Sequence, residues 1–291
     1  MSQNDRIRKI KRIFNGRPTI EGAGVHLKRA FGFSEVPLFD PFLLLDDFRS
    51  DNPAYYESGF PWHPHRGIET ITYMIDGRVE HGDSIGNSGI IGPGDVQWMT
   101  AGNGILHQEM PKGDNTGKMG GFQLWVNLPA SHKMMDPRYR DVKSDTIPLV
   151  KLDSGVSIKI ICGNINGVRG PVRDVVVDVE YLDLSIPIDS EYMHSVRPGY
   201  TTFVYLIEGM AMLGDERPEV ANGNLVLFDD GNRISLITND KPARMLLLAG
   251  KPIGEPIAWR GPIVMNTKEE LQTAYTEYRQ GTFIKQGNIA Q

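Results

Sequence analysis

The feature of this sequence that most constrains its fold is an internal repeat. Gly67–Gly77 (GIETITYMIDG) aligns without gaps to Gly199–Gly209 (GYTTFVYLIEG), and Gly94–Glu109 (GDVQWMTAGNGILHQE) aligns to Gly223–Thr238 (GNLVLFDDGNRISLIT). The two blocks contain five and four identities, occur in the same order, and are displaced by nearly the same number of residues. Chance matching of glycines would not preserve this order, and the displacement is far longer than the period of a solenoid. We therefore interpret the chain as a duplicated domain.

Both copies of the repeat read as β-strands joined by tight turns. Thr70–Ile75 (TITYMI) and Thr201–Ile207 (TTFVYLI) are rich in β-branched and aromatic residues, and each is followed by an acidic residue and a glycine. Helical signals are sparse until residues 267–279, where Thr267 and Glu270 have the spacing of a capping box. Many short strands at regular spacing predict an all-β sandwich or barrel, here in two copies with a short C-terminal helix.

The division between the two copies is expected in a polar, turn-rich stretch at residues 136–145 (DPRYRDVKSD). We therefore predict an N-terminal domain at residues 1–138 and a C-terminal domain at residues 139–291. The basic run Arg6–Arg12 (RIRKIKR) alternates basic with apolar residues. This alternation favours an edge strand with a solvated face over a nucleic-acid-binding arm.

Composition excludes several classes of function. The 31 basic and 36 acidic residues give a net charge of −5, which does not favour a nucleic-acid partner. Cys162 is the single cysteine, so an intrachain disulfide and CxxC motifs are excluded, as is usual in a reducing compartment. The N-terminal residues contain no apolar signal-peptide core, and no stretch approaches the ~18 apolar residues of a membrane span. We expect a cytoplasmic protein without membrane or direct nucleic-acid partners.

Two short motifs in the first copy have the spacing of metal ligands. His63-Pro64-His65 and His107-Gln108-Glu109 each place two ligand-type side chains at positions i and i+2. In an extended strand such residues point to the same face, about 7 Å apart at Cα. Two adjacent strands of this kind predict a site with three nitrogens and one carboxylate, leaving one or two coordination positions open.

The second copy of the repeat supports this metal-site interpretation. The positions of the four candidate ligands are occupied there by Ser195, Arg197, Leu236 and Thr238. All four ligand types are therefore absent together, although the surrounding glycines and strand residues remain. Residues that served only packing would not be expected to disappear as a set, so we predict metal binding in the first copy alone.

Other candidate residues carry weaker signals. Glu69 is either a carboxylate outside the ligand set that orients one of the ligand histidines, or a strand residue that faces solvent. Large apolar side chains beside the histidine strands are more often core residues, but they can also line a cavity next to the ion. These candidates for the cavity wall are Phe60, Trp62, Met74 and Trp98. The remaining histidines have no partner at ligand spacing and are interpreted as structural or surface residues, namely His26, His81, His132 and His194.

Several longer runs closely resemble the pirin family of bicupins, proteins made of two cupin barrels of the double-stranded β-helix or jelly-roll type. The resemblance covers essentially the whole chain, is strongest over residues 39–129, and includes the specific motifs HPHRGxET and TAGxGIxHxE. The runs that carry it are Gly16–Gly32 (GRPTIEGAGVHLKRAFG), Phe39–Phe48 (FDPFLLLDDF), Gly59–Gly77 (GFPWHPHRGIETITYMIDG) and Pro93–Pro111 (PGDVQWMTAGNGILHQEMP).

The resemblance implies a bicupin whose N-terminal barrel alone holds a metal ion. Family members bind iron through three histidines and one glutamate, and the matching positions are His63, His65, His107 and Glu109. Iron(II) is therefore the expected ion, although such a site also accepts Mn, Ni, Co, Cu or Zn. Some members resemble flavonol dioxygenases that open quercetin with O2, whereas animal members are described as redox-sensitive nuclear cofactors of transcription regulators.

These implications give one leading hypothesis and two alternatives. The leading hypothesis is a quercetin 2,3-dioxygenase-type enzyme that acts on a flavonol and O2, with Glu109 as the general base for the flavonol 3-hydroxyl. The first alternative is an iron- or redox-responsive regulator that binds a protein partner without turnover. The second is a different metalloenzyme such as a sugar isomerase, because a fold does not fix a function; the Trp- and Met-rich flanks argue against its polar pocket.

Overall fold

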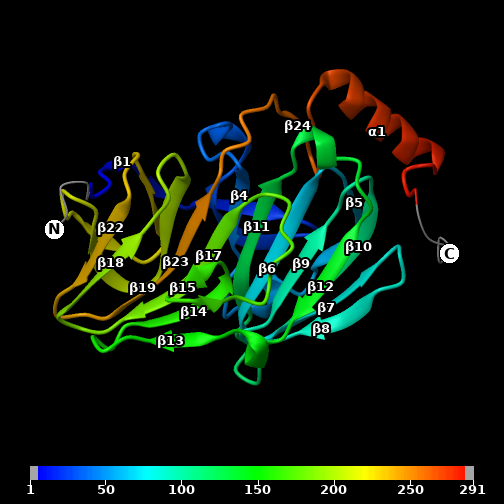
Figure 1. Ribbon diagram of the computed structural model, residues 1–291. Coiled ribbons are helices and arrows are strands. Elements are labelled where there is room, and N and C mark those ends of the chain that lie inside the picture. The colour runs from blue at the N-terminus through cyan, green and yellow to red at the C-terminus, as the bar shows by residue number, and fades with distance from the viewer. Residues whose placement is uncertain (1–5, 286–291) are drawn as a thin grey trace. The chain divides into compact units, whose positions relative to one another are not determined.

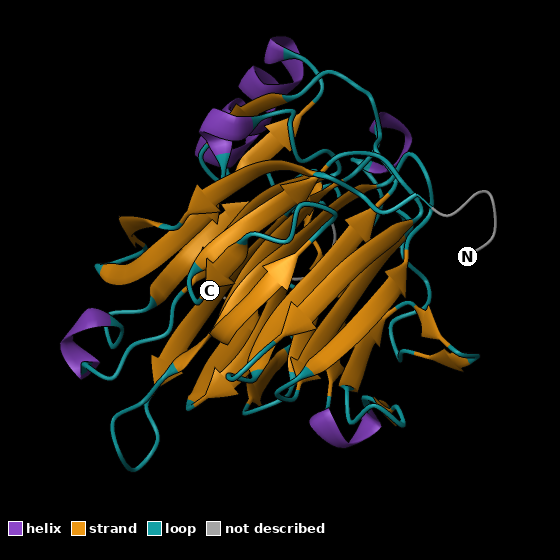
Figure 2. Cartoon of the chain, turned by 90° about the vertical axis from the view of Figure 1, so that its left-hand side faces the viewer, coloured by secondary structure: helices purple, strands orange, loops and turns teal. Residues whose placement is uncertain are grey.

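The computed structural model describes residues 6–285, and most of them lie in β-strands with helical turns at the strand ends (Figure 2). The chain forms two compact units. The N-terminal unit contains residues 17–144 and 253–285, and the C-terminal unit contains residues 6–16 and 145–252. Within residues 6–285, no helix combines the length and the apolar character needed to cross a membrane.

Each terminal segment of the described chain belongs to the unit that is formed mainly by the other half of the chain. The first strand, β1 (Ile10–Asn15), pairs with β21 (Asn224–Phe228) in the C-terminal unit. Residues 253–285, orange to red in Figure 1, belong to the N-terminal unit. The boundary after residue 144 lies inside the stretch expected to link the copies. These units differ from the expected consecutive division into 1–138 and 139–291, because residues 6–16 belong to the C-terminal unit and residues 253–285 to the N-terminal unit.

The N-terminal unit is built from a seven-stranded sheet, in the order β12-β9-β6-β11-β4-β3-β2, and a four-stranded sheet, in the order β5-β10-β7-β8. A short hairpin of β24 and β25 and the helix α1 complete it. Its strands are β2 (Arg17–Glu21), β3 (Val25–Phe31), β4 (Phe42–Asp47), β5 (Phe60–His65), β6 (Ile68–Asp76), β7 (Arg78–Asp83), β8 (Ser88–Ile91), β9 (Val96–Thr100), β10 (Ile105–Lys112), β11 (Gly120–Asn127), β12 (Arg138–Val142), β24 (Ala258–Arg260) and β25 (Ile263–Met265). Its short 3-10 turns are Phe33–Glu35, Pro53–Tyr55 and Ala130–His132.

The C-terminal unit repeats the antiparallel architecture around an apolar core. Its main sheet has ten strands, and β15 and β16 form a separate small pair. The additional elements of this unit are β13 (Leu149–Lys151), β14 (Ser157–Cys162), β15 (Asn164–Ile165), β16 (Val168–Arg169), β17 (Val179–Ile186), β18 (Ser190–Ser195), β19 (Thr201–Leu213), β20 (Glu219–Ala221), β22 (Arg233–Thr238) and β23 (Ala243–Gly250), and a 3-10 turn at Ser144–Thr146 spans the unit boundary. Leu236, at the position that corresponds to His107, is fully buried in this core.

The predicted C-terminal helix is confirmed. Helix α1 (Lys268–Gln280) is preceded by Thr267, whose side chain accepts a hydrogen bond from the backbone N–H of Glu270, while the Glu270 side chain accepts one from Thr267. The helix ends at Gly281, which has a left-handed backbone conformation. Local capping chemistry therefore specifies both ends of this helix.

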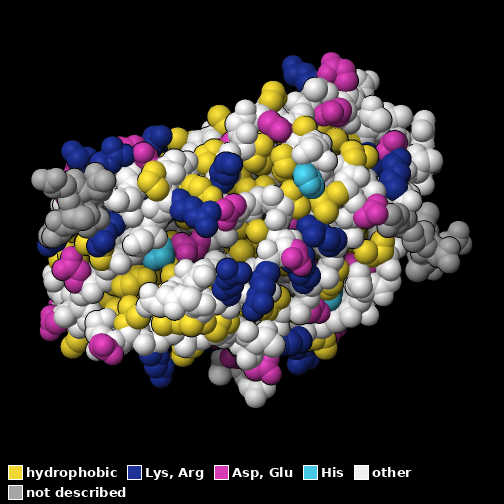
Figure 3. Space-filling view, in the orientation of Figure 1, with side chains coloured by type: hydrophobic (Ala, Val, Ile, Leu, Met, Phe, Trp, Pro, Cys, Tyr) yellow, Lys and Arg dark blue, Asp and Glu magenta, His cyan; other side chains and the backbone are white. Residues whose placement is uncertain are grey.

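The basic run near the N-terminus behaves only partly as expected. The strand β1 lies at the edge of the main sheet of the C-terminal unit, as predicted. Arg8, however, is buried, and its guanidinium donates to the backbone oxygens of Arg197, Tyr200 and Gly231. This arginine holds loops together and is not part of a solvated face. Elsewhere, Lys and Arg side chains lie among Asp and Glu side chains on the face shown in Figure 3.

A buried lysine fastens the C-terminal segment within the N-terminal unit. The Lys133 ammonium donates to the backbone oxygens of Gly67 (2.9 Å) and Val264 (3.0 Å) and to Oδ1 of Asn127 (2.7 Å). Gly67 has a φ of +77°, and a Cβ at this position would collide with the carbonyl oxygen of Val264. Strand β25 can therefore approach this turn only because residue 67 is a glycine.

We predict that Lys133→Met loosens the C-terminal segment. The substitution removes the ammonium donor from three buried oxygens, of which the Gly67 oxygen retains a 3.3 Å hydrogen bond from the backbone N–H of Leu128. It is expected to lower the free energy of unfolding by about 2 to 3 kcal/mol. Urea denaturation and the rate of proteolytic cleavage within residues 253–285 measure this effect. Lys112→Met is the control, because the Lys112 ammonium pairs with Glu80 at the surface. Equal unfolding curves for the two variants would contradict the prediction.

Candidate metal centre and cavity

Strand pairing brings three of the predicted ligands together. In the antiparallel pair of β5 and β10, His63 lies opposite His107, and His65 follows two residues along the same face. The ring centroids of His63 and His107 are 4.3 Å apart, and His65 lies 4.9 Å from each of them. One ligand atom from each of these histidines lies within 4.8 Å of the others, so the group could hold a metal ion.

The hydrogen bonds of two histidines leave lone pairs that face each other. Nδ1 of His63 lies 2.8 Å from the carbonyl oxygen of Pro61, and Nδ1 of His65 lies 3.0 Å from that of Pro262. A carbonyl oxygen can only accept, so both Nδ1 atoms donate, and the Nε2 atom of a ring that carries its proton on Nδ1 alone presents a lone pair. The two Nε2 atoms are 3.1 Å apart. Two lone pairs at this separation repel each other unless a cation lies between or beside them.

The environment of the histidines also fits a metal ion. Burial lowers the pKa of both His65 and His107 well below the usual range, so protonation is disfavoured. Nε2 of His107 is buried and has no hydrogen-bond partner among the described residues. Buried polar atoms are rarely left unsatisfied. Neutral imidazoles with unused nitrogens are the form of histidine that ligates divalent metals.

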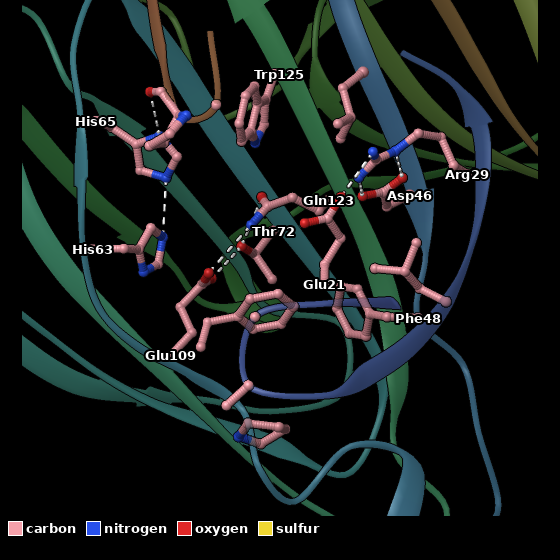
Figure 4. Close-up of a pocket in the computed structure, with 18 of the residues that line it drawn as sticks. Glu21, Arg29, Asp46, Phe48, His63, His65, Thr72, Glu109, Gln123 and Trp125 are labelled. Atoms are coloured by element: carbon pink, nitrogen blue, oxygen red, sulfur yellow. Dashed lines mark hydrogen bonds and ion pairs between the residues drawn. The ribbon is translucent and has the colours of Figure 1, made fainter. Parts of the chain in front are cut away.

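Glu109 lines the same cavity, but its carboxylate is turned towards two other side chains (Figure 4). Thr72 donates its hydroxyl to Oε1 at 2.9 Å, and Gln123 donates its amide to Oε2 at 3.3 Å. The group of ligand atoms that lie within 4.8 Å of one another contains the three histidines and not Glu109. Its role as a fourth ligand therefore stays a prediction.

A cavity of about 740 Å³ extends from the histidines between the two sheets of the N-terminal unit. The lining residues alternate along the strands, as expected for one face of a sheet. Strand β4 contributes Leu44 and Asp46, and Phe48 follows directly after it. Strand β11 contributes Gln123 and Trp125. Most of the remaining wall is apolar, and this size is ordinary for a small-molecule site. Further apolar lining residues are Leu27, Phe33, Phe60, Val79, Met119 and Trp259.

The expected cavity wall is only partly correct. Phe60 lines the cavity, but the other three predicted residues do not: Trp62 is 50% exposed, whereas Met74 and Trp98 are buried in the core. Trp62 lies between Pro61 and His63, which do line the cavity, whereas Met74 packs in one core cluster with the lining residues Phe48 and Val79. A single sequence does not reveal which apolar side chains of a strand reach a cavity and which pack behind its wall. Glu69 is buried, outside the cavity lining, and accepts a hydrogen bond from Thr100 at 2.6 Å.

Two parts of the site were missed by the sequence analysis. Trp125 packs edge-on against His65, with ring centroids 5.1 Å apart, and Trp259 lies beside Trp125 at 5.8 Å. The C-terminal segment supplies Trp259 and the Pro262 carbonyl that holds His65. The alternation within FLLLDDF and GFQLWV could have indicated inward-facing residues on β4 and β11. No local signal places residues near 260 beside His65.

The far end of the cavity carries a charged cluster, which we call the distal cluster and define as Glu21, Arg29 and Asp46. Arg29 donates to both carboxylate oxygens of Asp46 at 2.9 and 2.8 Å, and its Nη1 lies 2.9 Å from Oε1 of Glu21. Burial raises the pKa of Asp46 to about 6, although the hydrogen bonds from Arg29 act in the opposite direction. The distal cluster was not anticipated either.

The other histidines do not join the group. His81 and His194 are both buried, and their ring nitrogens contact Tyr139 and Glu180 respectively. The interpretation of His81 and His194 as structural residues agrees with these contacts, and the described part of the chain shows no second cluster of metal-ligand type.

Two units built mainly of antiparallel strands in one chain have the architecture of a bicupin. Family models confirm this class and specify it further: the model described as Pirin matches residues 24–126, and the Pirin C-terminal cupin domain matches residues 181–284. The chain belongs to the pirin family, and the resemblance seen in its motifs is confirmed.

Individual relatives extend over nearly the whole chain. A pirin-like protein of Caulobacter vibrioides is 44% identical over 278 residues, which cover 95% of this chain and 99% of that protein. Pirin of Homo sapiens is 38% identical over 267 residues, covering 90% and 89% respectively. The crystal structure of a quercetin 2,3-dioxygenase from Acinetobacter baumannii has a TM-score of 0.88 and 31% identity, covering 96% of this chain and 99% of that one.

We predict a pH-dependent contribution of Asp46 to stability. Its pKa is about 6 in the folded protein against an ordinary value of 3.8, so the folded state retains a proton that the unfolded state loses first. As the pH rises from about 4 to about 6, the free energy of unfolding contributed by this carboxyl therefore decreases, by at most about 3 kcal/mol. Denaturant unfolding of the wild type and of Asp46→Asn across this range measures the effect. Two parallel pH profiles would contradict it.

Proposed function

We propose that this protein is a metal-dependent dioxygenase of the quercetinase type, which opens a flavonol such as quercetin with O2. The observation that carries the proposal is the convergence of three imidazoles, those of His65 and His107 buried and that of His63 partly buried, at one end of a largely apolar cavity. The A. baumannii structure, named as a quercetin 2,3-dioxygenase, supports the reaction class. The substrate assignment is the part that experiment must establish.

In this proposal, His63, His65, His107 and Glu109 hold one divalent ion. Three neutral nitrogens and one carboxylate are a donor set that binds iron, manganese, nickel, cobalt, copper or zinc, and the resemblance to pirins favours iron(II). When bound, the ion supplies a Lewis acid that favours the anionic form of a hydroxyl at its open position and gives access to O2 chemistry.

Glu109 is the group in this chain that can accept the proton of the flavonol 3-hydroxyl. Its Oε1 and Oε2 each have lone pairs beyond those used by Thr72 and Gln123. These two donors fix the carboxylate at the cavity wall near the histidines. A carboxylate so held at the wall can act as a general base when it is not engaged by the ion.

The remaining side chains orient the substrate and exclude water. Trp125 packs against His65 and Trp259 packs against Trp125, so both offer aromatic surfaces that suit the face of a flat ring system. The Pro262 carbonyl fixes the orientation of the His65 ring through Nδ1. Apolar walls further along the cavity keep water away from the substrate.

The first prediction of this proposal concerns metal content. Freshly purified protein is expected to contain about one equivalent of a divalent transition metal, and His63→Ala and His107→Ala are expected to lose at least roughly 10-fold in metal affinity because each removes a direct ligand. Elemental analysis and metal titration measure this. His132→Ala is the control, because His132 is exposed and outside the candidate group. Unchanged metal content in both ligand variants would exclude the site.

The second prediction concerns turnover. Metal-loaded protein under oxygen is expected to consume quercetin, seen as loss of the flavonol absorbance, and to release carbon monoxide. Glu109→Gln removes the proposed base and is expected to lower kcat by roughly 10² to 10⁴. The same assay with His132→Ala should match the wild type. Absence of turnover with several divalent metals, in protein that contains its metal, would reject the substrate and favour a regulator that binds a protein partner.

A further inference from the structure

We propose that the distal cluster of Glu21, Arg29 and Asp46 recognises a phenolic hydroxyl at the end of the substrate remote from the histidines. The cavity then selects flat aromatic compounds that carry hydroxyl groups at both ends. This inference rests on the proposed function for the orientation of the ligand and deepens it by naming residues that determine specificity.

The geometry of the cavity supports two separate polar ends. Figure 4 shows His63 and His65 on one side of the cavity and the Arg29–Asp46 pair on the other, with Gln123 between them. The histidines come from β5, whereas Arg29 and Asp46 come from the neighbouring strands β3 and β4 of the opposite sheet. A ligand with its metal-binding oxygens at the histidines therefore directs its other end towards the distal cluster.

The hydrogen-bonding capacity of the distal cluster suits a hydroxyl group. The contacts of Arg29 with Asp46 and Glu21 involve three of the five N–H groups of its guanidinium, so two N–H groups can donate to a ligand. Each Asp46 oxygen accepts one bond from Arg29 and has a second lone pair that can accept another. A phenol both donates and accepts one hydrogen bond, so it can satisfy an arginine N–H and a carboxylate together.

The charge of the distal cluster argues against an anionic ligand. One guanidinium faces two carboxylates, so no positive charge is in excess, and a carboxylate or sulfonate of a ligand would meet like charges. Neutral donors are not penalised in this way. The carboxylates of Glu21 and Asp46 strengthen a hydrogen bond that a ligand hydroxyl donates, because hydrogen bonds to an ionised acceptor are stronger than those between neutral groups.

The apolar part of the surface between the two ends, which lies beside Gln123, favours a flat apolar body. Leu44 and Phe48 flank Asp46 on the inward face of β4 and the residue after it, and Trp125 lies near the histidine end. These side chains offer apolar contact but few polar atoms. A rigid aromatic ligand that spans the cavity loses little conformational entropy on binding.

The test compares two flavonols under anaerobic conditions, so that no turnover occurs. Quercetin and 3-hydroxyflavone share the 3-hydroxyl and 4-carbonyl oxygens, but only quercetin carries further hydroxyl groups. Dissociation constants are measured with metal-loaded protein by fluorescence quenching. Asp46→Asn is expected to weaken quercetin binding roughly tenfold and to leave 3-hydroxyflavone within about twofold, because only quercetin has a hydroxyl for the carboxylate.

The structure offers a closely matched control at the next residue. Asp47 is as buried as Asp46 and makes an equivalent two-point contact with Arg49, but it lies on the other face of β4 and does not line the cavity. Asp47→Asn should leave both dissociation constants unchanged. Glu21→Gln and Arg29→Met are second variants in case Asp46→Asn does not fold, and they should also weaken quercetin selectively.

The outcomes separate this inference from the proposed reaction. Equal losses for both flavonols, or no loss for either, in folded variants of the distal cluster would overturn the inference even if quercetin is turned over. Selective loss of quercetin affinity supports it even if the aerobic assay shows no turnover, in which case the reaction fails and the binding specificity stands. Failure of the wild-type protein to bind either flavonol would overturn both.

Discussion

The candidate site depends on one antiparallel strand pair. Because β5 and β10 run in opposite directions with His63 opposite His107, the alternation of side chains places His65 on the same wall. A slip of one residue in this register would turn the imidazoles to the other face. The backbone carbonyl oxygens of Pro61 and Pro262 then accept hydrogen bonds from Nδ1 of His63 and of His65, respectively, and so fix the orientation of these two rings. The chemistry of the site is therefore set first by register and only second by the identity of the ligands.

The sequence was sufficient for those parts of the molecule that have a local or periodic signature. Strand-rich repeats, the capping box at Thr267 and the paired HxH and HxE motifs all act over a few residues. The exchange of terminal segments has no such signature, because the contact of β1 with β21 joins residues more than 200 positions apart. The direction of the Glu109 carboxylate was also not predictable, since Thr72 and Gln123 reach it from other strands.

The second copy shows what the same architecture becomes without a ligand site. The strand pair β18 and β22 occupies the place in the repeat that β5 and β10 hold in the first copy, but Leu236 there belongs to a continuous apolar core. Closely packed apolar side chains stabilise a barrel, whereas a cavity lined by histidines and a charged cluster costs stability. The N-terminal unit therefore has a cavity lined by histidines, whereas the corresponding position of Leu236 in the C-terminal unit lies in packed apolar side chains.

The exchanged termini also bear on the order in which the molecule can be made. Residues 17–144 of the N-terminal unit are synthesised early, but its remaining segment, with Trp259, the Pro262 carbonyl and helix α1, is synthesised only after residues 145–252 of the other unit. Domains generally fold in the order in which they are made. Here residues 17–144 are completed by a segment that is made after the other unit, so the His65 ring acquires its contact with Pro262 only late in synthesis.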